Sequence, residues 1–411
     1  MQLNENIKLL PEKGVSIKKR VADFLSQAPD TTLIRLDQDL MNMPLPPKVT
    51  DEMKAAVDEV AAPFGVRLSS PWSGYESLKK GIVKHLGEGG VQISESDVFI
   101  TSGLESAHAC LAQLFGRDNN VLLPDPCERN LLELHHLLGH GVSFVRATPE
   151  NGFVPLPDAT TEDLVYLASP NPVTGVAMDR ESMEKWVNWA NENGSVILHD
   201  ASLSPYLRGE EYPRSIYEIP GAKDCAIELF SFEKGYGVRE LKIAYAIIPA
   251  TLVRCETRLR DLWCARQPAT ATPPGYVMQR AAELLISPEA GEDTQKIIHR
   301  IKKVAKKLSE GLNAAGIPNA GGETGPYIWA QCPREMSAWQ TFDLFLEKAG
   351  IVVTPGSLFG YGGERFFRLT AFGMPEEAAE AVEKIAKLCG TKQEESHGPS
   401  EEDVAAMLFS E

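Results

Sequence analysis

The sequence has 411 residues, 43% hydrophobic and 24% charged, a composition typical of a chain that buries a large core. Acidic residues outnumber basic ones by 57 to 41, and the resulting net charge of -16 repels the phosphates of nucleic acids and anionic membranes. We therefore expect a small-molecule or protein partner, and neither a nucleic acid nor a membrane.

Cysteine usage and the amino-terminal residues indicate a location. The 7 cysteines include neither a CxxC pair nor a Cys/His cluster, and we interpret them as reduced thiols. Residues 1–19 lack the apolar core of a secretory signal, and no window reaches the roughly 18 apolar residues of a membrane span. The expected location is the cytoplasm.

Short apolar runs alternate with helical patterns from about Val98 to Tyr245. This alternation is typical of an α/β fold in which helices cover a mainly parallel sheet, here of seven strands. The predicted strands are Val98–Ile100, Val121–Leu123, Ser143–Val145, Leu164–Leu167, Val196–Leu198, Ala226–Phe230 and Ile243–Ile248.

Beyond Pro249 the pattern predicts a second, smaller α+β domain. Long helices are expected over about Thr251–Leu285, broken at Pro273-Pro274, and over about Asp293–Ala315. Further predicted elements are strands at Tyr327–Ala330, Ile351–Val353 and Phe367–Thr370 and helices at Ala338–Ala349 and Pro375–Leu388. Residues 391–411 are acidic and interrupted by Gly and Pro, which predicts a disordered tail.

Lys234 follows a predicted buried strand, in a Gly-containing turn (FEKGYG, residues 232–237). A desolvated lysine at the carboxyl end of a strand can reach a ligand and form a Schiff base. A solvated surface lysine is the ordinary alternative.

Two other strand ends add to this pattern. Asp200 ends the predicted strand Val196–Leu198, so its carboxylate is expected at the same sheet edge, although such an Asp is more often a helix cap. Thr101-Ser102-Gly103 joins a strand to a helix, and the free N–H groups of this turn suit a phosphate. A lone TSG turn is weak support, since such turns are common.

Longer stretches resemble class I/II aminotransferases of pyridoxal 5'-phosphate (PLP) fold type I, and most closely the LL-diaminopimelate aminotransferases. The resemblance covers nearly the whole chain before the tail. It is carried by SPNPVTG (169–175), ENGSVILHD (192–200), SIYEIPGAKDCAIELFSFEK (215–234), PYIWAQCP (326–333) and FDLFLEKAGIVVTPGSLFGYGGERFFRLTAFG (342–373).

The resemblance implies four domain segments: an N-terminal segment of the small domain (1–49), a large PLP-binding domain (50–285), a C-terminal small domain (286–390) and the tail. It implies that Lys234 is the Schiff-base lysine, Asp200 the partner of the pyridinium nitrogen and Arg368 the clamp for the substrate α-carboxylate. On the sequence alone, Arg368 fits a structural ion pair equally well. Further cofactor contacts are expected from Ser231, Lys242, Gly103, Leu104 and Asn171, and Asn171 is also a candidate substrate contact.

The chain departs from the family pattern around the cofactor. Glu128 stands in place of the aromatic residue that stacks on the ring, and Pro172 and Leu203 replace the asparagine and tyrosine that bond the ring hydroxyl. Asn171 could replace the lost amide, and Trp72 or Tyr236 could supply an aromatic face. The other departures are Lys242 for arginine, Glu105 for lysine, Ser69 for the partner subunit's tyrosine and Thr272 for an asparagine tied to diaminopimelate.

Three functions stay open at this point. One is an aminotransferase-like enzyme that acts on an α-amino acid through Lys234. The second is a PLP-dependent elimination, replacement or cyclisation enzyme of specialised metabolism with an S-adenosylmethionine-like or hydroxyarginine-like substrate. The third is a non-catalytic binding module, which Glu105 and Glu128 favour because they bring negative charge to the cofactor. The resemblance also implies a homodimer with shared active sites.

His135 and His136 are the remaining candidates for chemistry. They are adjacent in a predicted helix, so they do not share one face on which a metal could bind. We interpret them as ordinary helix histidines and expect no metal.

Overall fold

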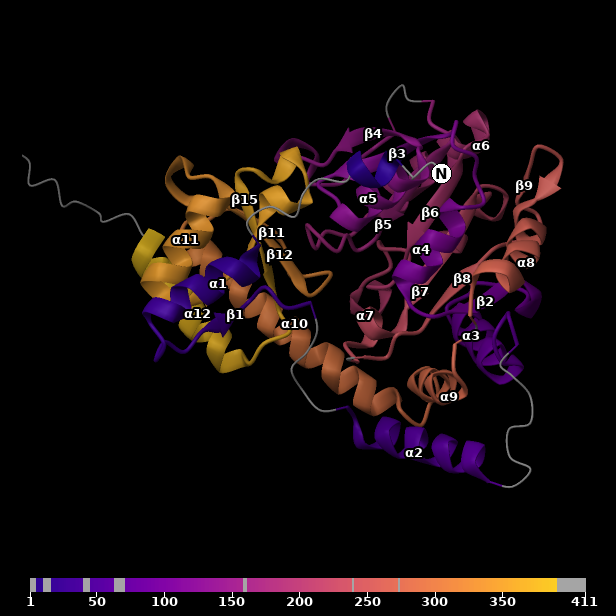
Figure 1. Ribbon diagram of the computed structural model, residues 1–411, viewed down its shortest axis with the longest axis horizontal. Helices are drawn as coiled ribbons and strands as arrows, with labels where there is room; N and C mark the ends of the chain where they lie inside the picture. Colours follow the sequence, from indigo (N-terminus) through magenta and orange to yellow (C-terminus); the bar gives the residue numbers. More distant parts are fainter. Residues whose placement is uncertain are drawn as a thin grey trace, which may run out of the picture.

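The computed structural model describes residues 5–9, 16–39, 45–62, 71–157, 161–238, 240–272 and 274–389. The chain forms a large lobe around a central sheet and a smaller lobe that contains both the first long helix and the C-terminal helices (Figure 1). The predicted tail, Ser69 and Pro273 lie outside the described residues.

A seven-stranded sheet forms the centre of the large lobe, and all seven predicted strands are confirmed. Its strands lie in the order β2-β8-β7-β6-β5-β3-β4, and they are parallel except that β8 is antiparallel to both neighbours. The strands are β2 (Val98–Thr101), β3 (Asn120–Asp125), β4 (Gly141–Arg146), β5 (Leu164–Ala168), β6 (Val196–Asp200), β7 (Ala226–Ser231) and β8 (Ala244–Ile247).

Helices cover both faces of this sheet because its central strands are apolar on both sides. On β7, Phe230 packs into one hydrophobic cluster with Trp186, while the adjacent Leu229 packs into another with Trp263. The helices of this lobe are α2 (Pro47–Ala61), α3 (Glu76–Glu88), α4 (Leu104–Ala112), α5 (Arg129–Leu138), α6 (Arg180–Asn193), α7 (Phe232–Tyr236), α8 (Leu259–Thr270) and α9 (Tyr276–Leu285).

The small lobe is an α+β unit whose C-terminal part begins with α10, and the helices α8 and α9, expected from the pattern beyond Pro249 to belong to it, lie in the large lobe. The N-terminal segment joins the small lobe through β1, which pairs in parallel with β13. Its antiparallel sheet has the order β11-β12-β15-β14. Its elements are α1 (Ile17–Gln27), β1 (Ile34–Arg35), α10 (Gly291–Ala314), β11 (Asn319–Gly321), β12 (Tyr327–Gln331), α11 (Ala338–Ala349), β13 (Ile351–Val352), β14 (Thr354–Pro355), β15 (Phe366–Thr370) and α12 (Pro375–Cys389).

Short 3-10 helices complete the described structure: η1 (Glu5–Leu9), η2 (Glu95–Asp97), η3 (Pro149–Asn151), η4 (Ser204–Tyr206), η5 (Ile216–Glu218), η6 (Ala222–Asp224), η7 (Pro333–Glu335), η8 (Gly356–Phe359) and η9 (Tyr361–Gly363).

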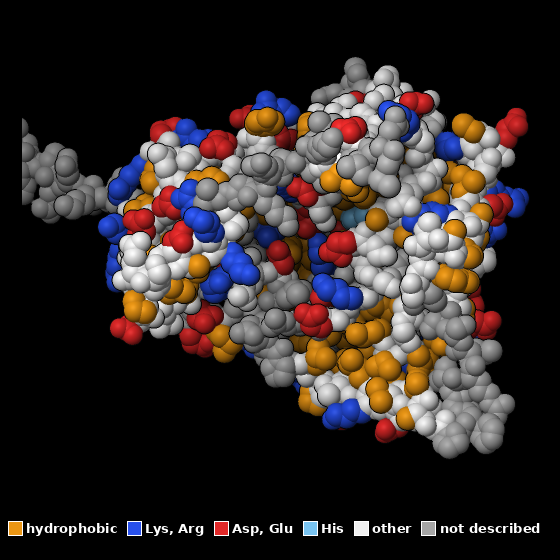
Figure 2. Space-filling model, viewed as in Figure 1, with side chains coloured by type: hydrophobic (Ala, Val, Ile, Leu, Met, Phe, Trp, Pro, Cys, Tyr) orange, Lys and Arg blue, Asp and Glu red, His pale blue; other side chains and the backbone are white. Residues whose placement is uncertain are grey.

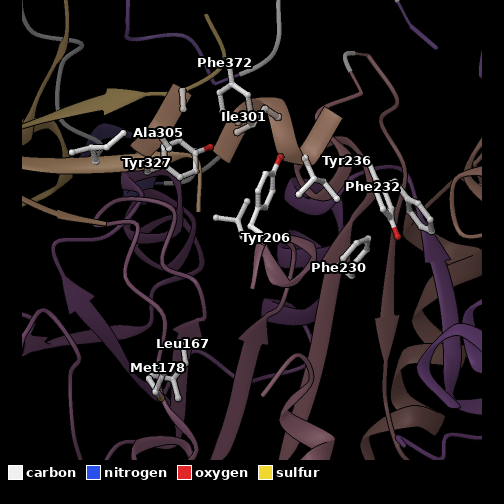
Figure 3. Packing of buried hydrophobic residues seen from close by; sticks show 14 of the residues in the cluster. Leu167, Met178, Tyr206, Phe230, Phe232, Tyr236, Ile301, Ala305, Tyr327 and Phe372 are labelled. Carbon is white, nitrogen blue, oxygen red and sulfur yellow. The ribbon is translucent and has the colours of Figure 1, made fainter. Parts of the chain in front are cut away.

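One hydrophobic cluster connects the two lobes (Figure 3). Tyr206 of the large lobe lies between Tyr236 and the side chains of Ile301 and Tyr327, which belong to the small-lobe elements α10 and β12. Lys302 of α10 also donates a hydrogen bond to the Tyr206 carbonyl at 2.9 Å. The lobes therefore share a core at the carboxyl edge of the central sheet.

Two sequence predictions need correction. The helix expected from about Thr251 begins only at Leu259, because Val253–Arg254 (β9) and Thr257–Arg258 (β10) form an antiparallel hairpin. Both residues at its tip, Cys255 and Glu256, have positive φ, which ends any helix there. The turn expected around Lys234 is the short helix α7.

None of the helices in the described part of the chain combines the length and apolarity needed to span a bilayer.

Candidate active site

Lys234 lies in α7, directly after the carboxyl end of β7. The helix begins there because the Ser231 hydroxyl caps it and accepts a hydrogen bond from the Lys234 backbone N–H at 3.3 Å. The Lys234 side chain is 15% exposed, so it is not the solvated surface lysine of the ordinary alternative. Ser231 is thus committed to positioning the lysine as well as being a candidate cofactor contact.

Asp200 ends β6, which pairs in parallel with β7, so its carboxylate lies at the same sheet edge. It is buried and accepts hydrogen bonds from the Tyr166 hydroxyl at 3.2 Å and from the Ser202 backbone N–H at 2.8 Å. Burial, and next the charge of Asp200, raise the pKa of Tyr166 well above its usual value. Tyr166 therefore remains a neutral donor that orients the carboxylate.

His108 adds a polar group that the sequence did not single out. It is buried on α4, its ring meets the edge of Tyr166 at a centroid distance of 5.3 Å, and burial lowers its pKa, so it is neutral at pH 7. Among the described residues nothing pairs with its Nε2. The one sequence feature that connects His108 with this site is its helix α4, which follows the TSG turn.

Glu128 forms an ion pair with the candidate anchor. Its Oε1 and Oε2 lie 3.2 and 3.3 Å from Lys234 Nζ, and its side chain is 21% exposed. Although burial opposes ionisation, the charge and hydrogen bond of Lys234 lower the pKa of Glu128. Although burial likewise opposes charge on the lysine, Glu128 raises the pKa of Lys234 above its usual value.

The loop that carries Glu128 is fixed between the two lobes. The Cys127 N–H donates to the Phe359 carbonyl at 2.8 Å, and the Gly362 N–H donates to the Asp125 carboxylate at 3.0 Å. Glu128 is also the N-cap residue of α5. Both sides of the loop are therefore held by backbone contacts, which place the carboxylate at Lys234.

Arg368 lies on β15, where its side chain is almost fully buried. Its Nη1 donates to the Pro172 carbonyl at 2.9 Å and its Nη2 to Asp39 at 2.7 Å. The guanidinium lies 4.7 and 4.6 Å from the ring centroids of Tyr327 and Phe359. Two aromatic rings thus hold the guanidinium, and its two terminal nitrogens bond to acceptors of this chain.

The two altered residues at the ring hydroxyl follow neighbouring strands: Pro172 lies in the loop after β5, beside Asn171, and Leu203 lies after β6. Asn171 Oδ1 accepts hydrogen bonds from the Val173 and Thr174 N–H groups at 2.8 and 3.0 Å, which commits this oxygen to its own loop. Leu203 is buried in the hydrophobic core. The contact of Asn171 with a cofactor or substrate stays a prediction.

The two aromatic substitutes proposed from the sequence lie in different surroundings. Tyr236 is buried with its ring 5.9 Å from that of Phe230, so it belongs to the core. Trp72 is 44% exposed and its stacking role stays untested.

The candidate phosphate side lies around Gly103 and Leu104, at the start of α4. Gly103 has a φ of 96°, and a Cβ there would lie 3.9 Å from the Lys242 carbonyl carbon, so the turn and Lys242 are neighbours. Leu104 is buried, which leaves its backbone as its candidate contact. Lys242 Nζ pairs with Glu233 at 2.8 Å and its side chain is 52% exposed.

These groups match the chemistry that PLP requires of a protein. A buried carboxylate, a lysine at the end of the adjacent strand and a helix start with free N–H groups provide for the ring nitrogen, the aldehyde and the phosphate. Glu128 is the exception, since it brings a carboxylate to the anchor. Figure 2 shows side chains of both charge signs along the boundary between the lobes.

A cavity of about 500 Å³ lies elsewhere in the structure, lined by Phe230, Tyr236 and Tyr245 among others, and does not include Lys234. Of its acidic lining residues, Glu218 pairs with Arg180 and Glu228 accepts from Ser215. We therefore place the candidate chemistry at Lys234 rather than in this cavity. His135 is buried, and its Nδ1 lies 2.9 Å from Nδ1 of His140, so it is a core histidine. No group of residues that could hold a metal ion occurs in the described ranges.

Fold and site together define the class: a fold type I PLP protein. The model of the family "Aminotransferase class I and II" matches residues 34–385, and the chain belongs to this family, whose members depend on PLP.

Several relatives in this family share one name. An LL-diaminopimelate aminotransferase of Lachnospira eligens is 34% identical, with 94% of this chain and 100% of the relative covered. One of Prochlorococcus marinus is 35% identical, with 92% and 96% covered. The structure of the Chlamydomonas reinhardtii L,L-diaminopimelate aminotransferase superposes with a TM-score of 0.89 at 28% identity, covering 95% of this chain and 99% of that one.

Proposed function

We propose that this protein is a PLP-dependent aminotransferase that removes the amino group of an α-amino acid and delivers it to an oxo acid. The observation that carries the proposal is the placement of Lys234 and the buried Asp200 at the carboxyl ends of the adjacent parallel strands β7 and β6. When bound, PLP supplies an electron sink that makes the α-proton of an amino acid removable.

The residues of this chain divide the work of holding the cofactor. Lys234 binds it covalently, and Asp200, oriented by Tyr166, keeps a proton on the ring nitrogen. Ser231, Lys242 and the backbone at Gly103 and Leu104 hold the phosphate, and Asn171 contributes beside the ring.

Arg368 binds the substrate α-carboxylate through its two terminal nitrogens, which exchange the Asp39 and Pro172 oxygens for those of the substrate. Tyr327 and Phe359 hold the guanidinium in place against their rings during this exchange. The Lys234 amine would also move the α-proton of the amino acid.

The relatives' name makes LL-diaminopimelate the first candidate substrate. Further parts of the proposal are a cytoplasmic location and a homodimer whose active sites receive residues 69–75 and Thr272 from the neighbouring subunit. The segment boundaries 1–49, 50–285 and 286–390 also belong to it, and the pairing of β1 with β13 supports assigning the first segment to the small domain.

The test begins with the absorption spectrum of the purified protein with PLP, beside Lys234→Ala. We expect a band near about 420 nm in the wild type that is missing from the variant. Amino acids, LL-diaminopimelate first, are then added with 2-oxoglutarate, and transfer of a ¹⁵N label to glutamate is measured.

Label transfer supports the aminotransferase. Loss of a side-chain leaving group without label transfer would instead point to elimination chemistry. Identical spectra for wild type and Lys234→Ala would reject Lys234 as the anchor and favour a binding module.

A further inference from the structure

The Lys234 ammonium already has a partner within its own chain. Among the described residues, Glu128 accepts the hydrogen bonds of Nζ, one on each carboxylate oxygen, at 3.2 and 3.3 Å. Both side chains are mostly buried, at 15% and 21% exposure, so water screens the pair weakly.

The surroundings strengthen the charge on both partners. Desolvation lowers the pKa of Lys234. Glu128, and after it Tyr327 and Asp200, raise this pKa by more, so the pKa of Lys234 lies above its usual value. Near neutral pH the neutral amine is therefore rarer than for an ordinary lysine, about tenfold for each unit of the increase.

Covalent capture of PLP requires that amine. The ammonium first releases a proton to solvent, and the freed electron pair of Nζ then forms a bond to the aldehyde carbon. The carbonyl oxygen leaves as water after taking one proton from nitrogen and regaining the released one, so nothing is oxidised or reduced. The resulting protonated imine has one N–H, and it cannot retain both hydrogen bonds that the ammonium makes to Glu128.

We propose that Glu128 is an internal counter-ion that holds Lys234 back from PLP, so that this protein captures the aldehyde form of the cofactor slowly and weakly. The proposal rests on the proposed function, because it takes PLP as the ligand. It also implies selectivity: the amine form, pyridoxamine 5'-phosphate, has no aldehyde, and its binding leaves the Lys234–Glu128 pair intact.

The experiment compares wild type with Glu128→Gln, which keeps the size of the side chain and removes its charge. Cofactor-free protein is titrated with PLP and, separately, with pyridoxamine 5'-phosphate, and Kd is read from absorbance and fluorescence. The rate of imine formation is followed by stopped flow, and borohydride reduction with mass spectrometry locates the bond on Lys234. Glu133→Gln is the matched control, since Glu133 lies in the same helix α5 and pairs with Arg129 instead of Lys234.

We expect Glu128→Gln to lower the Kd for PLP and to raise the rate of imine formation, each at least about tenfold. The Kd for pyridoxamine 5'-phosphate should stay within about twofold, and Glu133→Gln should match wild type in every measurement. If Glu128→Gln does not fold, Glu128→Asp, which keeps the charge but withdraws it from Nζ by one methylene, should shift PLP binding in the same direction.

Two results would overturn the proposal. One is an unchanged Kd and rate for PLP. The other is an equal tightening for both cofactor forms, which would mean general charge repulsion rather than competition for Lys234. Failure of the proposed function looks different, because then neither wild type nor Glu128→Gln would form a reducible bond to PLP at Lys234.

Discussion

The two sides of the candidate site are built differently. On the sheet side, Lys234 and Asp200 follow neighbouring parallel strands whose register fixes their positions. On the opposite side, Glu128 and Asp39 come from connecting segments, and each pairs with a cation of the site, Lys234 or Arg368. A substitution at a strand end disturbs the packing of the core, whereas a substitution in a connecting segment leaves the core unchanged. The candidate anchor and ring partner thus lie on the sheet side, and the departure from the family pattern at Glu128 lies on the side that faces them.

The largest effect should come from breaking the sheet side at Asp200. We expect Asp200→Asn to lower kcat by at least about a hundredfold, because an amide cannot hold a proton on the ring nitrogen. The measurement is steady-state amino transfer with saturating PLP. Tyr166→Phe removes only the 3.2 Å hydrogen bond to the same carboxylate and should cost about tenfold or less. Equal losses in the two variants would contradict the assigned roles.

The same division explains what the sequence could predict. Strands such as β6 and β7 are buried and mostly apolar, and the residues that end them, Asp200 and Ser231, follow directly from that pattern. Local signals failed at Cys255 and Glu256, where two residues of positive φ form a hairpin tip in place of the predicted helix.

The ion pairs were beyond sequence reasoning. Glu128 and Lys234 are 106 residues apart, and Asp39 and Arg368 are 329 apart, so the folded arrangement of the lobes alone brings them together. The sequence predicted negative charge from Glu128 near the cofactor but not its partner. His108 was missed because a lone histidine in a helix has no distinguishing pattern.

Arg368 belongs to both sides, since it lies on β15 but pairs with the connecting segment at Asp39. We expect Arg368→Lys to raise KM for the amino acid by about 10- to 100-fold, because an ammonium cannot form the two parallel hydrogen bonds of a guanidinium to a carboxylate. The Kd for PLP should change little, which serves as the control. An unchanged KM would show that the carboxylate binds elsewhere.

Asp39 offers a smaller test of the connecting side. Asp39→Asn removes the charge that the substrate carboxylate must displace from Arg368 Nη2, so KM should fall. Since the Asp39 side chain is 52% exposed and solvent screens it, we expect a change of only about two- to fivefold. Asp37→Asn is the matched control, because Asp37 lies in the same segment and pairs with Arg35 instead. A rise in KM for Asp39→Asn alone would mean that Asp39 positions Arg368 rather than competing for it.

The last effect concerns stability rather than activity, and its pH dependence tests whether the Glu128–Lys234 pair is charged. The folded pKa of Glu128 is lowered, so its contribution is present above the unfolded pKa of about 4.3 and is lost as pH falls through the folded value. The pKa of Lys234 is raised, so its contribution is present below about 10.4 and is lost only at higher pH. Between about pH 5 and 9, cofactor-free Glu128→Gln should therefore be less stable than wild type by a constant amount, about 3 kcal/mol, because Lys234 loses the partner of a mostly buried ion pair. Urea unfolding at pH 7 and at pH 3.5 measures this difference, and it should shrink at the lower pH. An equal difference at both values would mean that packing of the Glu128 side chain, and not its charge, supports the fold.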